Sequence, residues 1–142
     1  MVNMSNILTI KTFNITPLRI LISTLKEIFS KTNIIFTNKE ITIRKVSDTV
    51  LVNTVLKANH CEVFECTKPK IIIAVNMFHL YNLINSINPN IYDTLTIYIE
   101  DKDYSEGVVS NLGFKFENSI TKQCKIQKLG LIEPDEEEPK LN

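Results

Sequence analysis

The sequence predicts an α+β fold in which two helices lie on one face of a mostly antiparallel sheet. The prediction rests on a pattern that occurs twice. An apolar, strand-like run leads directly into a helix at residues 7–13 and again at residues 71–75, and strand-like segments follow each helix. Each helix has one wide apolar side, so both are expected to pack on the same face of the sheet. A duplicated β-α-β-β-β unit within 142 residues indicates one domain that buries its own core.

The first helix is expected to begin near Thr16, whose hydroxyl can cap it, with Pro17 where a missing N–H costs nothing. Polar residues recur along one side of this helix, and its positive charges, Arg19 and Lys26, share that side. Glu27, beside them, is the acid of the helix. A separate apolar stripe should face the sheet; it consists of Leu18, Leu21, Ile22, Leu25, Ile28 and Phe29.

Strand-like segments follow the first helix. Residues 33–36 and 40–44 flank a short turn and predict a hairpin. Residues 50–56 are apolar and rich in β-branched side chains, which favours a third strand, and residues 62–66 form a short extended segment.

The second helix is expected to run from residue 77 to about residue 87 and to stop at the Asn-Pro-Asn sequence of residues 88–90. Three further strands should follow, at residues 93–100, 108–117 and 120–129, with a charged turn between the first two. The apolar residues on the inward side of this helix are Met77, Leu80, Leu83, Ile84 and Ile87.

The composition changes from residue 130 onward. Periodicity ends there, and two prolines flank four consecutive acids. This composition is typical of an extended, solvated segment. We therefore expect a folded domain over residues 1–129 and a connector with an acidic tail over residues 130–142.

The balance of charges and the cysteines narrow the functional classes. Lys plus Arg and Asp plus Glu number 16 each, so overall charge gives no sign of a nucleic-acid partner and local placement must carry that argument. Three cysteines without framework spacing suit a reducing compartment. No apolar run approaches the roughly 20 residues needed to cross a bilayer, so we expect no membrane partner.

The sequence contains no recognisable motif for catalysis or for cofactor binding. The sequence lacks a phosphate loop, a nucleophile elbow and a paired histidine and carboxylate, and glycine is scarce. His60 and Cys61 with Cys66 would need a fourth ligand and closer pairing to hold zinc. Asp101 and Asp103 with Glu100 could bind a cation, but an acidic turn between strands is the commoner arrangement. We therefore expect that the protein is not an enzyme and that it holds no cofactor and no metal.

Five short runs, in order along the chain, resemble the N-terminal domain of sliding clamps of the proliferating cell nuclear antigen family. They are LKEI at 25–28, FEC at 64–66, AVN at 74–76, LTIYIED at 95–101 and KLGLIE at 128–133. The resemblance covers essentially the whole chain from residue 7. A subunit of that family has two such domains joined by a connector, so the second clamp domain is expected to be absent from this chain. Whether the chain is half of a longer protein or a single-domain clamp stays open.

The resemblance implies a DNA polymerase processivity factor. Subunits of such clamps form a ring around duplex DNA, are placed on it by a clamp loader, and tether enzymes of replication and repair. Contact with DNA is independent of sequence and is made by the helices. The matching positions here are Arg19 and Lys26 in the first helix and Asn82 and Asn85 in the second, where the family usually has basic residues. The implied location is the nucleus, or a cytoplasmic viral replication site if a virus encodes the protein.

Two further surfaces follow from the same resemblance. A groove for short peptides of polymerases and other clients would be formed by Val46, Val50, Leu129, Leu131 and Ile132. The last strand before the connector would pair with a neighbouring subunit, since an exposed strand edge is a template for pairing. The residues of this subunit-interface strand are Thr121, Lys122, Gln123, Cys124, Lys125 and Ile126.

Other functions remain open at the level of sequence. A non-ring processivity factor would bind short linear DNA directly and with strong salt dependence. A checkpoint-type clamp scaffold would bind mainly proteins. The simplest interpretation of Arg19 and Lys26, taken without the resemblance, is a solvated helix face.

Overall fold

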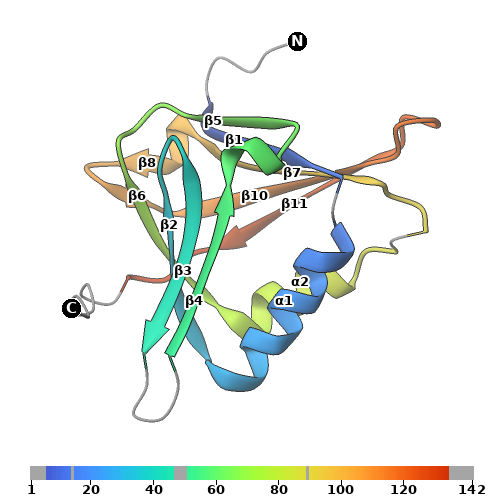
Figure 1. Cartoon of the computed structure of the whole chain (residues 1–142). Helices are drawn as coiled ribbons and strands as arrows, with labels where there is room; N and C mark the ends of the chain where they lie inside the picture. The colour runs from blue at the N-terminus through green and yellow to red at the C-terminus, as the bar shows by residue number, and fades with distance from the viewer. Residues whose placement is uncertain (1–5, 14, 47–50, 89, 135–142) are drawn as a thin grey trace.

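The computed structural model describes residues 6–13, 15–46, 51–88 and 90–134. Its main elements are two antiparallel sheets and a pair of helices (Figure 1). The predicted α+β class is confirmed. Among these residues no helix is both long and apolar enough to cross a membrane.

The strands fall into a five-stranded sheet, a four-stranded sheet and a short hairpin. The five-stranded sheet has the order β11 (Cys124–Gly130), β10 (Asn111–Glu117), β7 (Thr94–Glu100), β1 (Asn6–Thr12), β5 (Val63–Cys66). The four-stranded sheet has the order β4 (Leu51–Lys57), β3 (Glu40–Val46), β2 (Lys31–Phe36), β6 (Ile71–Asn76). The hairpin pairs β8 (Tyr104–Ser105) with β9 (Val108–Val109).

The strand that precedes each helix pairs with a strand that follows the other helix. β1 precedes the first helix and pairs with β7, whereas β6 precedes the second helix and pairs with β2. The two halves of the chain therefore interlock. The single sheet expected from the sequence is corrected to two sheets, because strongly twisted strands tend to divide into separate sheets that enclose a core.

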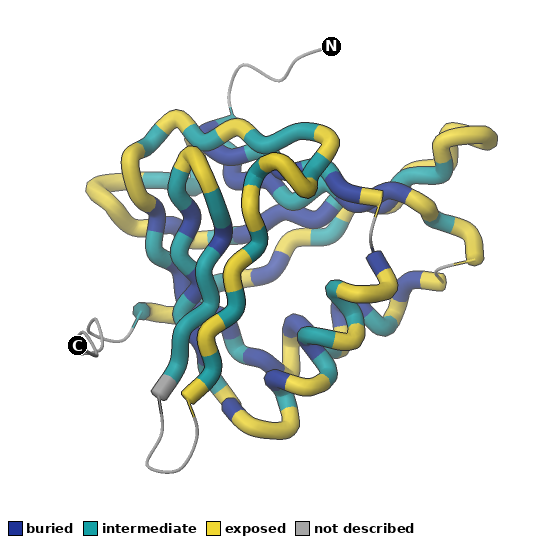
Figure 2. The backbone as a smooth tube through the Cα atoms, in the orientation of Figure 1, coloured by how far each residue is buried: buried dark blue, intermediate teal, exposed yellow. Residues whose placement is uncertain are grey.

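The helices α1 (Ile15–Ile28) and α2 (Met77–Asn85) lie beside each other and cover both sheets (Figure 1). Inward side chains of both helices meet side chains of the two sheets around an apolar cavity of about 60 Å³. Burial is concentrated on the inner strands and on α2, whereas the outer strands β4 and β11 and the outer side of α1 are largely exposed (Figure 2). Some of the cavity-lining residues are Leu18, Ile22, Phe36, Leu80, Ile97 and Phe114.

The predicted inward sides of the helices are mostly confirmed. The apolar residues predicted for the second helix are all buried, although Ile87 lies just beyond the end of α2, and in α1 Ile22 and Leu25 are buried. Ile28 is a correction, because its side chain is 43% exposed at the end of α1. Ile20 is 62% exposed, so α1 carries apolar side chains on its outer side as well.

Several element boundaries differ from the prediction; α2, for example, ends at Asn85 and not near residue 87. α1 begins at Ile15, so Thr16 lies in the first turn and not before it. The strand expected at 108–117 is divided at Ser110, because β9 pairs with β8 whereas β10 pairs with β7 and β11. The turn at Glu106 and Gly107, both with positive φ, closes the β8–β9 hairpin. The last strand begins four residues later than expected. Asn118 Oδ1 accepts hydrogen bonds from the backbone N–H groups of residues 120 and 121 and folds that segment into a turn.

Candidate functional site

The two cations of the helix pair lie between α1 and α2. Arg19 donates from Nη2 to Oδ1 of Asn85, at 2.8 Å, and Asn85 in turn donates from Nδ2 to the carbonyl of Tyr81, at 3.0 Å. Lys26 Nζ lies 4.2 Å from the centre of the Tyr81 ring. Since Arg19 is near the start of α1 and Asn85 is at the end of α2, the helices run antiparallel.

These contacts orient both charges. The guanidinium of Arg19 has five N–H donors, so a bond to Asn85 leaves capacity for an anion. The Lys26 side chain is 23% exposed and its ammonium lies over an aromatic face, which favours a cation. Glu27 Oε1, 3.1 Å from Lys26 Nζ, opposes an anion there, although its side chain is 73% exposed and the pair is screened by water.

The second helix contributes polarity without charge. Its sequence, MFHLYNLIN, contains no Lys, Arg, Asp or Glu. Asn82 is exposed and Asn85 is half-buried against Arg19. Phe78 is 57% exposed, so the outer surface of the helix pair mixes a few charges with apolar side chains.

An open hollow of about 290 Å³ lies where α1 ends and α2 begins. Asn76 caps α2 by accepting a hydrogen bond from the N–H of His79 at 3.1 Å. The residues that line the hollow are Lys26, Glu27, Phe29, Ser30, Asn76 and Phe78.

Of the five residues predicted for a peptide groove, the structure describes Leu129, Leu131 and Ile132 in full. Leu129 is 7% exposed and belongs to the core, so it could support a groove only from beneath. Leu131 is half-buried against the core and Ile132 is 39% exposed. The N–H of Ile132 donates to the carbonyl of Ala74 on β6, at 3.2 Å. The segment after β11 therefore leaves the five-stranded sheet and contacts the edge of the four-stranded one. Val46 ends β3 and its side chain lies outside what is described, as does residue Val50 altogether.

Only the second half of the predicted subunit-interface segment lies in a strand. Residues 121–123 belong to the turn between β10 and β11, and Lys122 there has a φ of 66°. Cys124, Lys125 and Ile126 open β11, which is the outer strand of its sheet, and all three are exposed. The edge pairing with a neighbour remains a prediction.

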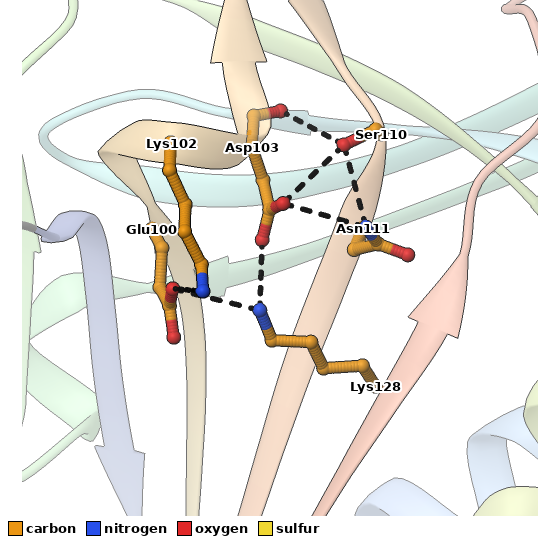
Figure 3. Close-up of polar contacts among 6 residues, drawn as sticks. All are labelled: Glu100, Lys102, Asp103, Ser110, Asn111 and Lys128. Atoms are coloured by element: carbon orange, nitrogen blue, oxygen red, sulfur yellow. Dashed lines mark hydrogen bonds and ion pairs between the residues drawn. The ribbon is translucent and has the colours of Figure 1, made fainter.

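A polar network at the start of the connector was not foreseen (Figure 3). Lys128 on β11 donates to Asp103 Oδ2 at 3.0 Å and lies 3.5 Å from Glu100 Oε2. The hydrogen bond from Lys128 holds the pKa of Asp103 below its ordinary value, and the bond to Asp103 raises the pKa of Lys128. These residues are 25 positions apart, so no local spacing in the sequence signals the contact.

The described residues offer no metal site, and Cys61 and Cys66 are not activated thiols. Among them no group of three potential ligands could hold a metal ion. Cys61 and Cys66 are half-buried, and burial raises the pKa of both thiols. A raised pKa keeps each sulfur protonated at neutral pH and lowers its reactivity as a nucleophile or ligand.

An α+β domain with two helices and mostly antiparallel sheets is compatible with a domain of a DNA clamp. The chain is 29% identical over 90 residues to a protein of Acanthamoeba polyphaga mimivirus named as a probable DNA polymerase sliding clamp. The match includes 63% of this chain and spans 19% of the length of that relative. No family model matches the sequence. The similarity supports a distant relationship with sliding clamps.

Proposed function

We propose that this chain is a domain of a DNA sliding clamp, a non-catalytic factor that keeps a polymerase on duplex DNA. The similarity to a probable DNA polymerase sliding clamp supports the proposal, and the fold is compatible with it. The observation that carries it is the antiparallel helix pair in which Arg19 is held by Asn85 and Lys26 by Tyr81 of α2.

The charges predict weak, sequence-independent contact with DNA. Each phosphate neutralised by Arg or Lys contributes about −0.9 to the slope of log K against log salt concentration. Arg19 and Lys26 would therefore give a slope of about −1.8 for one copy, which is far below that of a protein that grips DNA strongly. Asn82 and Asn85 can hydrogen-bond a phosphate but add no charge, so most of the attraction comes from α1.

Such weak contact requires another means of attachment. In the proposed function a ring of copies or domains encloses the duplex, and the exposed edge of β11 supplies one joint of that ring. A clamp loader opens the ring, and client peptides bind beside Leu131 and Ile132. The ring raises the effective concentration of its client at the template.

The DNA contact is tested by a salt titration. Fluorescence anisotropy of a labelled 30-base-pair duplex is followed between low and physiological salt. The wild type should show a slope of about −1.8, and the Arg19→Ala/Lys26→Ala double variant a slope near zero. Lys39→Ala, which removes an exposed cation from the turn between β2 and β3, is the matched control and should behave as wild type. Equal losses in both variants would overturn the assignment of the helix face.

Two competing functions are separated by DNA topology. A ring remains on closed circular DNA through a high-salt wash and leaves when the circle is cut, whereas a non-ring processivity factor is washed off both forms. The uncharged α2 favours one alternative, a clamp-like scaffold that binds mainly proteins. A slope of zero for the wild type, with unchanged retention of protein partners, would support that scaffold.

A further inference from the structure

Asp103 is the centre of a network at the connector end of the five-stranded sheet (Figure 3). It ends the short helix η2 (Asp101–Asp103), which follows β7. Its Oδ2 accepts from Lys128 Nζ at 3.0 Å, and its Oδ1 accepts from Asn111 Nδ2 at 3.4 Å. Its backbone carbonyl accepts from the N–H of Ser110 at 2.9 Å and from the Ser110 hydroxyl at 3.3 Å. One residue therefore contacts β10, β11 and the segment between β9 and β10.

The network is better sheltered than an ordinary surface ion pair. The Asp103 side chain is 13% exposed and that of Lys128 is 32% exposed. Glu100 provides a second carboxylate for Lys128 and also pairs with Lys102, at 3.2 Å. Shared, partly buried charges hold their geometry more firmly than a single exposed pair.

The same network continues into the connector through the backbone. The carbonyl of Ser110, whose N–H is held by Asp103, accepts from the N–H of Leu131 at 2.9 Å. The next residue, Ile132, donates its N–H to the carbonyl of Ala74 on β6. A continuous path of hydrogen bonds thus runs from the Asp103 carbonyl to the first connector residues and the edge of the other sheet.

We propose that Asp103 is a positioning residue for the connector. Its carboxylate binds Lys128 on β11, Asn111 on β10 and, at 3.5 Å, the hydroxyl of Ser110. Through these contacts it holds residues 131–132 beside the edge of the four-stranded sheet, with Leu131 half-buried against the core and Ile132 39% exposed. The inference rests on the proposed function in one respect: the partner served by this surface is a short client peptide with apolar side chains. The positioning itself concerns this chain alone and can be measured without DNA or a peptide.

The test is amide hydrogen exchange, resolved by residue, on the whole chain. Asp103→Asn and Asp103→Ala should each speed exchange at the N–H groups of Leu131 and Ile132, by about tenfold in the alanine variant. Amides in the middle of β7, such as that of Ile97, should keep the wild-type rate. A general loss of stability would speed all of these amides together, which would overturn the proposal.

Matched controls separate a local role from a general one. Asp93→Asn removes a hydrogen-bonded carboxylate of lowered pKa at the opposite end of the same sheet, and should leave Leu131 and Ile132 unchanged. The charge-swapped pair Asp103→Lys/Lys128→Asp should restore part of the lost protection. If the single variants do not fold, raising salt to 1 M in the wild type should weaken the ion pair and speed the same two amides. Unchanged exchange in every arm would refute the positioning role and leave the DNA titration above unaffected.

Discussion

Different side-chain contacts hold the two ends of the β10–β11 hairpin. At the tip, Asp93 accepts hydrogen bonds from the Ser119 hydroxyl at 2.6 Å, from the Ser119 N–H at 3.2 Å and from the Thr94 hydroxyl at 2.7 Å. These donors are all uncharged. At the connector end, Asp103 is bound by the ammonium of Lys128.

The difference shows how one kind of residue can serve two purposes. The Asp93 contacts and those of Asn118, which donates to the carbonyl of Ile91, join two neighbouring turns of the five-stranded sheet. The Asp103 contacts lead through Ser110 to Leu131 and, one residue later, to β6 of the four-stranded sheet. A neutral cap is sufficient to shape a turn, whereas the ion pair lies where the chain must be directed from one sheet to the other.

The largest expected effect comes from a substitution between the two ends. Gly113 pairs with Tyr98 on one side and Lys128 on the other, and a Cβ at Gly113 would lie 2.3 Å from the Tyr98 ring. Gly113→Ala should therefore lower the free energy of unfolding by about 1–3 kcal/mol, as overpacking does, measured by urea denaturation. Gly130→Ala is the control, because a Cβ there meets nothing within 4 Å, and it should change stability by less than about 0.5 kcal/mol.

The Gly113 variant also tests the comparison itself. Displacing Tyr98 disturbs the side of β10 next to Lys128, so amide exchange should accelerate at the connector end more than at Ser119 in the tip. A second substitution, Tyr98→Ala, removes the ring and should recover part of the loss caused by Gly113→Ala. Uniform acceleration at both ends would mean that the hairpin opens as one unit.

The two ends should also differ in how stability responds to pH. Hydrogen bonds, first from Ser119 to Asp93 and from Lys128 to Asp103, lower the pKa of both carboxyl groups. Each therefore contributes stability above the unfolded aspartate pKa of about 3.9, which is lost as pH falls through the lower folded value. Lys128 has the opposite sign: its pKa is raised by Asp103, so its contribution is present below the unfolded lysine pKa of about 10.4 and is lost as pH rises through the higher folded value.

Difference measurements isolate these contributions. The stability gap between the wild type and Asp93→Asn should close in acid alone, whereas the gap between the wild type and Lys128→Gln should close in acid and again in alkali. Thermal melts between pH 2 and pH 11 would give both curves. Burial raises the pKa of Tyr98, which also titrates in alkali, so the Lys128 comparison is best repeated in a Tyr98→Phe background. A closing of the Asp93 gap in alkali would contradict the assignment of neutral partners at the tip.

The sequence predicts much of this architecture, and the exceptions have physical causes. Periodicity is a local signal, so both helices and most strands lie within a few residues of their expected positions. The β8–β9 hairpin depends on positive φ at Glu106 and Gly107, and a Glu-Gly pair is a weak turn signal. Whether strands form one sheet or two depends on pairings between distant segments, such as β1 with β7 and β2 with β6.

The candidate site divides in the same way. Helical spacing places Arg19 and Lys26 on one side of α1, but only the packing of α2 shows that Asn85 and Tyr81 hold them. The contact between Asp103 and Lys128 depends on the register of β10 with β11 and on η2, so it could not be read from spacing.

The smallest expected effect concerns Ile120, whose side chain at the tip is 87% exposed. The order of this turn comes from Asn118, whose Oδ1 accepts from the N–H groups of Ile120 and Thr121 at 2.8 and 2.9 Å, and not from apolar packing. Ile120→Ser keeps those backbone contacts, so it should change the free energy of unfolding by less than about 0.5 kcal/mol in urea denaturation. Asn118→Ala removes the acceptor and should destabilise the turn more, which amide exchange at Ile120 and Thr121 would detect. If the serine variant lost more stability than the Asn118 variant, apolar packing would hold the tip, and the contrast between a hydrogen-bonded tip and an ion-paired connector end would fail.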